Sequence, residues 1–208
     1  MQTLGSFELR RRLAGEIREL NENSILAGDE TDFQAAIELI SQANQLVSKN
    51  ATEWRPRIDE REGNDKTAED LFPFSPVIGS LSPISPPVKF YFKDGLVFGN
   101  MNLGVAYQGP PGCVHGGILA EFFDELLGAA NIASGNGGLT GKLTVKYRST
   151  TPLYKELRFE GRSYPPIGRK IRAQGWIWHE ETLCCEAEGV FISVDYDKFR
   201  QITVERHL

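Results

Sequence analysis

The segment from residue 108 to residue 128 limits this chain to few folds. Residues 109–112 read Gly-Pro-Pro-Gly, a combination that breaks regular structure and predicts a turn. The run from Ile118 to Ala133 follows and is apolar almost all round, which predicts a long helix buried on most of its faces. It nevertheless contains three carboxylates: Glu121, Asp124 and Glu125. A buried carboxylate is costly unless it is paired or used, so this helix is where we expect a functional site.

The spacing of this helix adds a geometric constraint. Four residues share one stripe of it: Gly117, Glu121, Asp124 and Gly128. Glycines at a helix start leave backbone N–H groups free, and with the helix dipole such an end can hold an oxyanion. Gly116 and Asp124 are about 12 Å apart along the axis, at about 1.5 Å per residue. Two antiparallel copies of the helix, but not one, can bring both groups to one carbonyl carbon. If the motif is catalytic, we expect at least a dimer with shared sites.

Two stretches of sequence point to a known family. Residues 110–117 read Pro-Pro-Gly-Cys-Val-His-Gly-Gly, with Asp124 nine residues after His115, and residues 139–148 read Leu-Thr-Gly-Lys-Leu-Thr-Val-Lys-Tyr-Arg. Over about residues 75–195 the chain closely resembles the hotdog-fold acyl-CoA thioesterases, in the branch of the PaaI-type enzymes and the mammalian long-chain acyl-CoA thioesterases. The resemblance implies an α+β fold, with an antiparallel sheet wrapped around a long central helix. It does not cover the first seventy residues.

The resemblance also implies an activity and a set of roles. The reaction is hydrolysis of an acyl-CoA thioester to a free acid and coenzyme A, with no metal and no cofactor beyond the coenzyme A of the substrate. The partner is a second copy, in a homodimer or a dimer of dimers. Asp124 matches the family's general base or nucleophile, and the sequence leaves both routes open. Gly116, together with Gly117, matches the oxyanion donor, and Thr140 matches a Ser or Thr that positions the water or the carboxylate.

Two of the matched positions carry a reservation. A lone histidine beside glycines more often makes a structural hydrogen bond, so we assign His115 a supporting role. Strict alternation along the strand puts Thr140 on the face of Lys142, away from the apolar residues, unless Gly141 marks a bulge.

Substrate contacts are less clearly indicated. Related enzymes often hold Asn or Gln where this chain has Gly109, so the neighbouring Gln108 is the remaining candidate. Cations suited to the phosphates of coenzyme A lie on one strand face and at a hairpin turn: Lys142, Lys146, Arg148 and Arg169. Exposed charges on a strand are usually only solvated. Gly128, one turn beyond Asp124, leaves room for the acyl chain, although close helix–sheet packing would also favour glycine there.

We divide the chain into an N-terminal helical extension with a linker, residues 1–70, and a hotdog thioesterase domain, residues 71–208. In the extension we expect helices over Ser6–Leu20 and from a cap at Thr31 or Asp32 to Ser48. A polar linker over Ala51–Asp70 and a proline-punctuated extended coil over Leu71–Pro87 follow. The predicted strands are Val88–Lys93, Leu96–Leu103, Leu139–Arg148, Glu156–Tyr164, Lys170–His179 and Leu183–Val194, the first two joined by Asp94-Gly95.

Composition excludes several other classes of protein. Residues 1–70 hold nine Lys or Arg and fifteen Asp or Glu, a net charge of −6 by count, which does not suit a nucleic-acid binder. No apolar run has the length of a membrane span, and three scattered cysteines predict a reducing, cytoplasmic location. The alternatives that stay open are a hotdog dehydratase or hydratase and a non-catalytic acyl-CoA-binding regulator.

Overall fold

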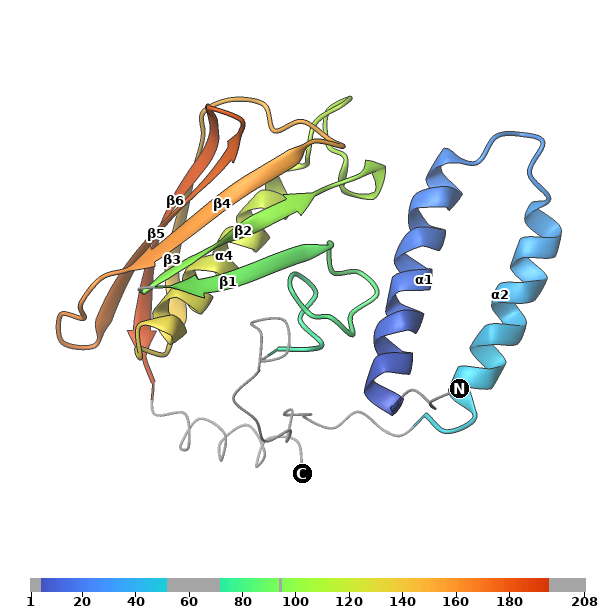
Figure 1. Cartoon of the computed structure of the whole chain (residues 1–208), viewed down its shortest axis with the longest axis horizontal. Helices are drawn as coiled ribbons and strands as arrows, with labels where there is room; N and C mark the ends of the chain where they lie inside the picture. Colours follow the sequence, from blue (N-terminus) through green and yellow to red (C-terminus); the bar gives the residue numbers. More distant parts are fainter. Residues whose placement is uncertain (1–4, 52–71, 94, 195–208) are drawn as a thin grey trace.

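The computed structural model describes residues 5–51, 72–93 and 95–194. Within these residues six strands form one antiparallel sheet, in the order β1-β2-β4-β5-β6-β3. The strands are β1 Val88–Lys93, β2 Leu96–Asn102, β3 Gly138–Tyr147, β4 Glu156–Ser163, β5 Lys170–His179 and β6 Thr182–Ser193. One long helix, α4 (Gly116–Ala133), lies against one face of the curved sheet (Figure 1). The predicted hotdog arrangement is confirmed, and each predicted strand boundary is within one residue of the observed one.

The buried face of α4 lies against glycines of the sheet. Leu126 and Leu127 are fully buried, and they face Gly161, Gly175 and Gly189 on β4, β5 and β6. A Cβ atom added at any of these glycines would lie 3.0 Å from a leucine side chain of the helix. The absence of side chains along this line therefore lets the helix approach the sheet closely.

Two helices precede the sheet. They are α1 (Ser6–Leu26) and α2 (Phe33–Ser48), and α1 lies between the sheet domain and α2 (Figure 1). The predicted cap of α2 is confirmed, since the Asp32 carboxylate accepts a hydrogen bond of 2.9 Å from the Ala35 N–H. α2 buries none of its side chains. In the described part of the chain, no helix combines the length and apolarity that a bilayer crossing requires.

α1 is six residues longer than predicted. The additional turns hold Glu22, whose carboxylate accepts hydrogen bonds of 3.0 Å from the N–H groups of Val105 and Ala106. These residues form a short 3-10 helix, η1 (Val105–Tyr107), just after β2. Burial by itself would raise the pKa of Glu22, but hydrogen bonds from Tyr154 and from the two N–H groups outweigh it and lower the pKa. A contact across more than 80 residues thus stabilises the end of α1.

The segment over residues 72–87 is irregular, as predicted, but it is not extended. Backbone hydrogen bonds from Ser75 to Phe72 and from Gly79 to Ser75 close successive turns. The turns bury Val77 and Ile78 in the core, which explains why the segment coils. The prediction of an extended coil was therefore wrong. The predicted linker, apart from Ala51, and Asp94 of the hairpin lie outside the described residues.

Candidate active site

A tight turn over residues 109–113 precedes the start of α4. The Gly109 N–H donates to the Cys113 carbonyl at 2.9 Å, and Gly112 takes a φ of +74°, which favours glycine. Gln108 and Val114 form an antiparallel bridge across the turn. The Gln108 side chain accepts a hydrogen bond of 3.2 Å from the Gly112 N–H. Gln108 therefore braces the turn in this chain.

The position of Gly109 in this turn has no room for a side chain. A Cβ atom added to Gly109 would lie 2.8 Å from the Cα atom of His115. A longer side chain there would push the backbone that leads into α4, so glycine is the residue that this turn accepts.

The first peptide unit of α4 is held at both of its polar groups. The His115 Nδ1 atom accepts a hydrogen bond of 2.9 Å from the Gly117 N–H, which makes His115 the N-cap of the helix. The Tyr147 hydroxyl, at the end of β3, donates to the Gly116 carbonyl at 2.7 Å. Because the Gly116 carbonyl and the Gly117 N–H belong to one peptide unit, the two side chains fix the plane of that unit. His115 thus makes a capping hydrogen bond at this helix end.

This arrangement leaves two donors at the helix end. The Gly117 N–H is occupied by His115, so it is not free to bind an oxyanion. Within the described part of the chain, nothing accepts a hydrogen bond from the N–H groups of Gly116 and Ile118. The N–H groups of Gly116 and Ile118 are therefore the donors that this helix end leaves unused in the described part of the chain, and the sequence did not indicate Ile118.

Asp124 lies two turns further along α4 and is half-buried. No hydrogen bond or ion pair reaches its carboxylate from the residues that the structure describes. One turn on, an added Cβ at Gly128 would meet no atom within 4 Å. Close packing of the helix on its own sheet therefore does not explain Gly128, and the space beside Asp124 is open in a single chain.

The neighbouring carboxylate, Glu125, is a group whose environment the sequence did not indicate. It accepts a hydrogen bond of 2.7 Å from the Ser75 hydroxyl in the 72–87 segment. Burial raises the pKa of Glu125, the Ser75 hydrogen bond partly opposes this, and the charges of Asp124 and Glu121 raise it further. The spacing of the helix gave no signal for Ser75, which lies 50 residues away in sequence.

A β-bulge decides where Thr140 lies. Thr140 pairs with Phe191 of β6 and Lys142 pairs with Val190, so Gly141 has no partner in this ladder. Directly opposed residues of an antiparallel pair share a face, and Phe191 is buried against α4. The bulge therefore brings Thr140 to the face of the sheet on which α4 lies.

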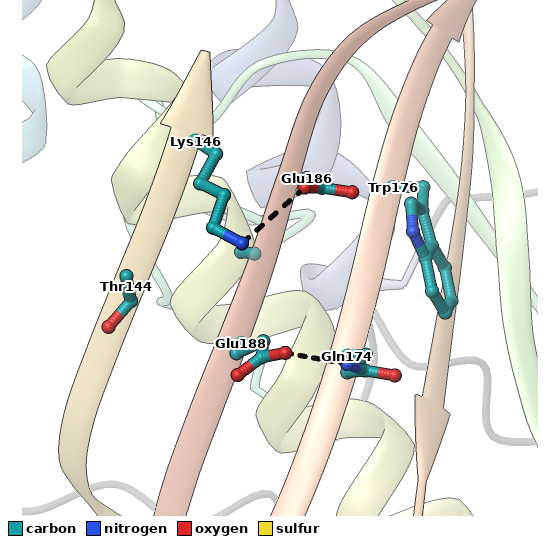
Figure 2. A pocket seen from close by; sticks show the side chains of 7 residues that line it. Thr144, Lys146, Gln174, Trp176, Glu186 and Glu188 are labelled. Carbon is teal, nitrogen blue, oxygen red and sulfur yellow. Dashed lines mark hydrogen bonds and ion pairs between the residues drawn. The ribbon is translucent and has the colours of Figure 1, made fainter. Parts of the chain in front are cut away.

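The predicted coenzyme A cations of β3 lie on the opposite face. Lys146 makes an ion pair of 3.8 Å with Glu186, and Figure 2 shows both side chains on the side of the sheet away from α4. Arg148 donates to the same carboxylate at 3.2 Å, and these interactions lower the pKa of Glu186, with the Arg148 hydrogen bond as the largest cause. Lys142, paired with Val190, shares that outer face, and Arg169 donates to the Ser193 carbonyl at 3.4 Å. One chain does not bring these cations together with Asp124.

Side chains that bind metals are not clustered. Among the described residues, no group of three or more His, Cys, Asp or Glu side chains could hold a metal ion. The three cysteines are unpaired, and Cys184 and Cys185 are buried.

The fold has counterparts in known proteins. No protein-family model matches the chain. A crystal structure described as a thioesterase superfamily protein superposes with a TM-score of 0.76 and 31% sequence identity, covering 88% of this chain and 90% of that one. The chain belongs to the thioesterase superfamily. The match covers 88% of this chain, whereas residues 72–194 make up only about 59% of it (123 of 208). The match therefore also includes part of the N-terminal region of this chain.

Curated relatives within the superfamily match over a shorter span. The acyl-coenzyme A thioesterase THEM4 of Mus musculus is 33% identical over 97 residues, which are 46% of this chain and 42% of the mouse protein. The protein of the same name from Xenopus laevis is 31% identical over 93 residues, which are 44% and 42% of the two chains. The matched region is therefore less than half of either relative.

Proposed function

We propose that this member of the thioesterase superfamily hydrolyses acyl-CoA thioesters to a carboxylic acid and coenzyme A. The observation that carries the proposal is the fixed peptide unit at the start of α4. His115 and Tyr147 hold that unit, and the preceding N–H, of Gly116, is left without an acceptor in the described part of the chain. A rigid, unoccupied donor at a helix N-terminus suits the oxyanion that forms when a thioester carbonyl is attacked.

The complete site requires two copies of the chain. Gly116 and Asp124 are about 12 Å apart along one helix, so they cannot act on one carbonyl carbon from the same α4. The stripe that carries Asp124 and Gly128 is open at Gly128 in one chain, since an added Cβ there meets nothing within 4 Å. An antiparallel α4 from a second copy would set its Asp124 opposite Gly116. We therefore propose a homodimer, or a dimer of dimers, with two shared sites.

Asp124 supplies the chemical step in one of two ways. As a general base it takes a proton from water, the water oxygen bonds to the carbonyl carbon, and the carbon–sulfur bond then breaks to release the coenzyme A thiolate. As a nucleophile, its carboxylate oxygen bonds to the carbonyl carbon and expels the thiolate, and water hydrolyses the resulting anhydride. In both cases Thr140, on the helix face of β3, positions the water or the carboxylate.

The cations have a secondary place in this proposal. Lys142, Lys146, Arg148 and Arg169 would meet the phosphates of coenzyme A only where copies adjoin, because in one chain the β3 cations lie on the outer face. The open space at Gly128 accommodates the substrate beside the reacting carbon.

The decisive experiment is a substrate panel with a matched variant. Free thiol release is followed with acyl-CoA esters from acetyl to palmitoyl and with phenylacetyl-CoA. Asp124→Asn, nearly isosteric, should keep the melting temperature and lose at least about 100-fold in kcat. If the parent releases no thiol from any ester although it binds one, the chain is an acyl-CoA-binding regulator. If Asp124→Asn retains kcat within a few-fold, the mechanism is wrong.

A further inference from the structure

A pocket of about 220 Å³ opens beside the first two turns of α4. Three regions line it: α4 itself, the end of β2 with η1, and the N-terminal region with the 72–87 segment. Its apolar wall includes Ile118, Phe122, Met101, Ala106, Pro76 and Ile84. Two of these six side chains come from the 72–87 segment, and Asn21 of α1 also contributes. The pocket is thus not made by the sheet and its helix alone.

Polar contacts fix the outer wall of this pocket. Ser75, next to Pro76, is hydrogen-bonded to Glu125 of α4 at 2.7 Å. The Arg18 guanidinium of α1 donates to the Ser82 carbonyl at 2.7 Å. Glu22 joins α1 to η1 through the Ala106 N–H. The 72–87 segment is therefore bonded to α4 and to α1, and α1 is bonded to η1, so the regions that line the pocket are connected to one another by hydrogen bonds.

The position of the pocket relates it to the proposed oxyanion donor. Ile118 lines the pocket and lies two residues after Gly116, whose N–H has no acceptor among the described residues. We infer that this pocket receives the acyl group of the thioester whose carbonyl oxygen binds Gly116 of the same chain. The inference rests on the proposed function and deepens it. Glu121, exposed at the pocket, would repel a second carboxylate, so the acyl group is an uncharged one.

The volume sets the size of the acyl group. A dry cavity of about 150 Å³ holds benzene, which corresponds to about 25 Å³ per carbon. On this scale about 220 Å³ accommodates about nine carbons. The substrate class is therefore a medium-chain or aromatic acyl-CoA, and a palmitoyl chain would extend beyond the pocket.

Two substitutions change the pocket without touching the start of α4. Ala106→Leu adds three carbons to the wall and should leave room for about six. Ile84→Ala opens the wall from a side chain that is 64% exposed, so little stability is at risk. Ala43→Leu, on the exposed α2, is the matched control.

The measurement is kcat/KM for butanoyl-, octanoyl- and dodecanoyl-CoA. Ala106→Leu should lower the octanoyl-to-butanoyl ratio by about 10-fold or more, which is the size of discrimination that a few methylenes give in an apolar pocket. Ile84→Ala should raise the dodecanoyl-to-octanoyl ratio, and Ala43→Leu should change neither. Parental ratios in both pocket variants, with an unchanged melting temperature, would overturn the inference. A parent that hydrolyses no ester would refute the proposed function instead.

A mixed dimer tests whether the pocket and Gly116 act within one chain. One chain carries Asp124→Asn and the other carries Gly116→Pro, which removes the donor N–H. The intact site of the mixed dimer then uses Gly116 of the first chain and Asp124 of the second. Ala106→Leu should alter the chain-length profile when it is added to the first chain and leave it parental when added to the second. The reverse pattern would put the acyl group in the pocket of the facing chain and overturn the assignment.

Discussion

Replacing Gly116 by proline removes one N–H group with little other change. Proline is well accepted at the first position of a helix, where its missing N–H is not used by the helix. The residue before a proline must be extended, and His115 already has a ψ of 131°. A Cβ atom at residue 116 would lie 3.3 Å from the Tyr147 ring, a contact that a small shift of the ring relieves. Gly116→Ala makes the same contact but keeps the N–H, so it is the matched control.

The expected loss follows from the role of the donor. Loss of one oxyanion donor costs about 10²–10³ in kcat. Gly116→Pro should therefore lose about that factor with the best acyl-CoA substrate, while Gly116→Ala stays within about 10-fold of the parent. Circular dichroism and melting temperature check that α4 is intact in both. Equal kcat values for the proline and alanine variants would show that the Gly116 N–H does not bind the oxyanion.

The same variant measures whether the site is shared. When Gly116→Pro and Asp124→Asn chains are refolded together in equal amounts, half of the dimers are mixed, and each mixed dimer has one of its two sites intact. The mixture should regain about one quarter of the parental activity, although each variant alone is nearly inactive. No recovery, after mass spectrometry has verified subunit exchange, would contradict a site built from two chains.

Three further predictions concern stability and the space around the site. Burial raises the pKa of Glu125, so its ionised form is disfavoured in the folded chain and the stability of the parent falls as the pH rises through that raised pKa. The free energy of unfolding of Glu125→Gln, measured with urea, should therefore equal that of the parent near pH 4 and exceed it at pH 7. Glu22→Ala should lose about 1–2 kcal/mol of stability through the broken hydrogen bonds to η1, whereas Glu19→Ala, exposed on the same helix, should lose almost none in the same assay. Gly128→Leu should keep the melting temperature of the isolated chain, because an added Cβ meets nothing within 4 Å. If the acyl group occupies the pocket at Ala106, the same substitution should lower kcat/KM equally for all acyl lengths.

The sequence was sufficient to predict the elements whose signal is local. The periodicity of residues 118–133, the cap at Asp32 and the conflict between Thr140 and strand alternation each predicted what the structure has. These features depend on neighbours within a few residues, which a single sequence displays directly.

What the sequence missed depends on contacts between distant residues. The end of α1 depends on Glu22 meeting η1, the coiling of the 72–87 segment accompanies a bond from Ser75 to Glu125, and the start of α4 is held by Tyr147. The sequence near Glu22, Ser75 or Tyr147 does not indicate which distant residue each of them will contact. The catalytic roles, the division at residue 70 and the cytoplasmic location stay predictions, the first because the site that we propose combines residues of two chains.

Because Gly141 is an extra residue in β3, the strand can lose it without changing which side chains face α4. A deletion inside a strand normally turns every residue on one side of it over to the wrong face. Removing Gly141 should not, because Thr140 and Lys142 already pair with adjacent residues of β6 and would simply become neighbours. Removing Leu143 instead would close the bulge by pairing Gly141 with Val190 and Lys142 with Gly189, which turns the Lys142 side chain toward α4. We therefore expect the chain without Gly141 to fold with Thr140 still toward α4, and the chain without Leu143 to be less stable because it buries a lysine.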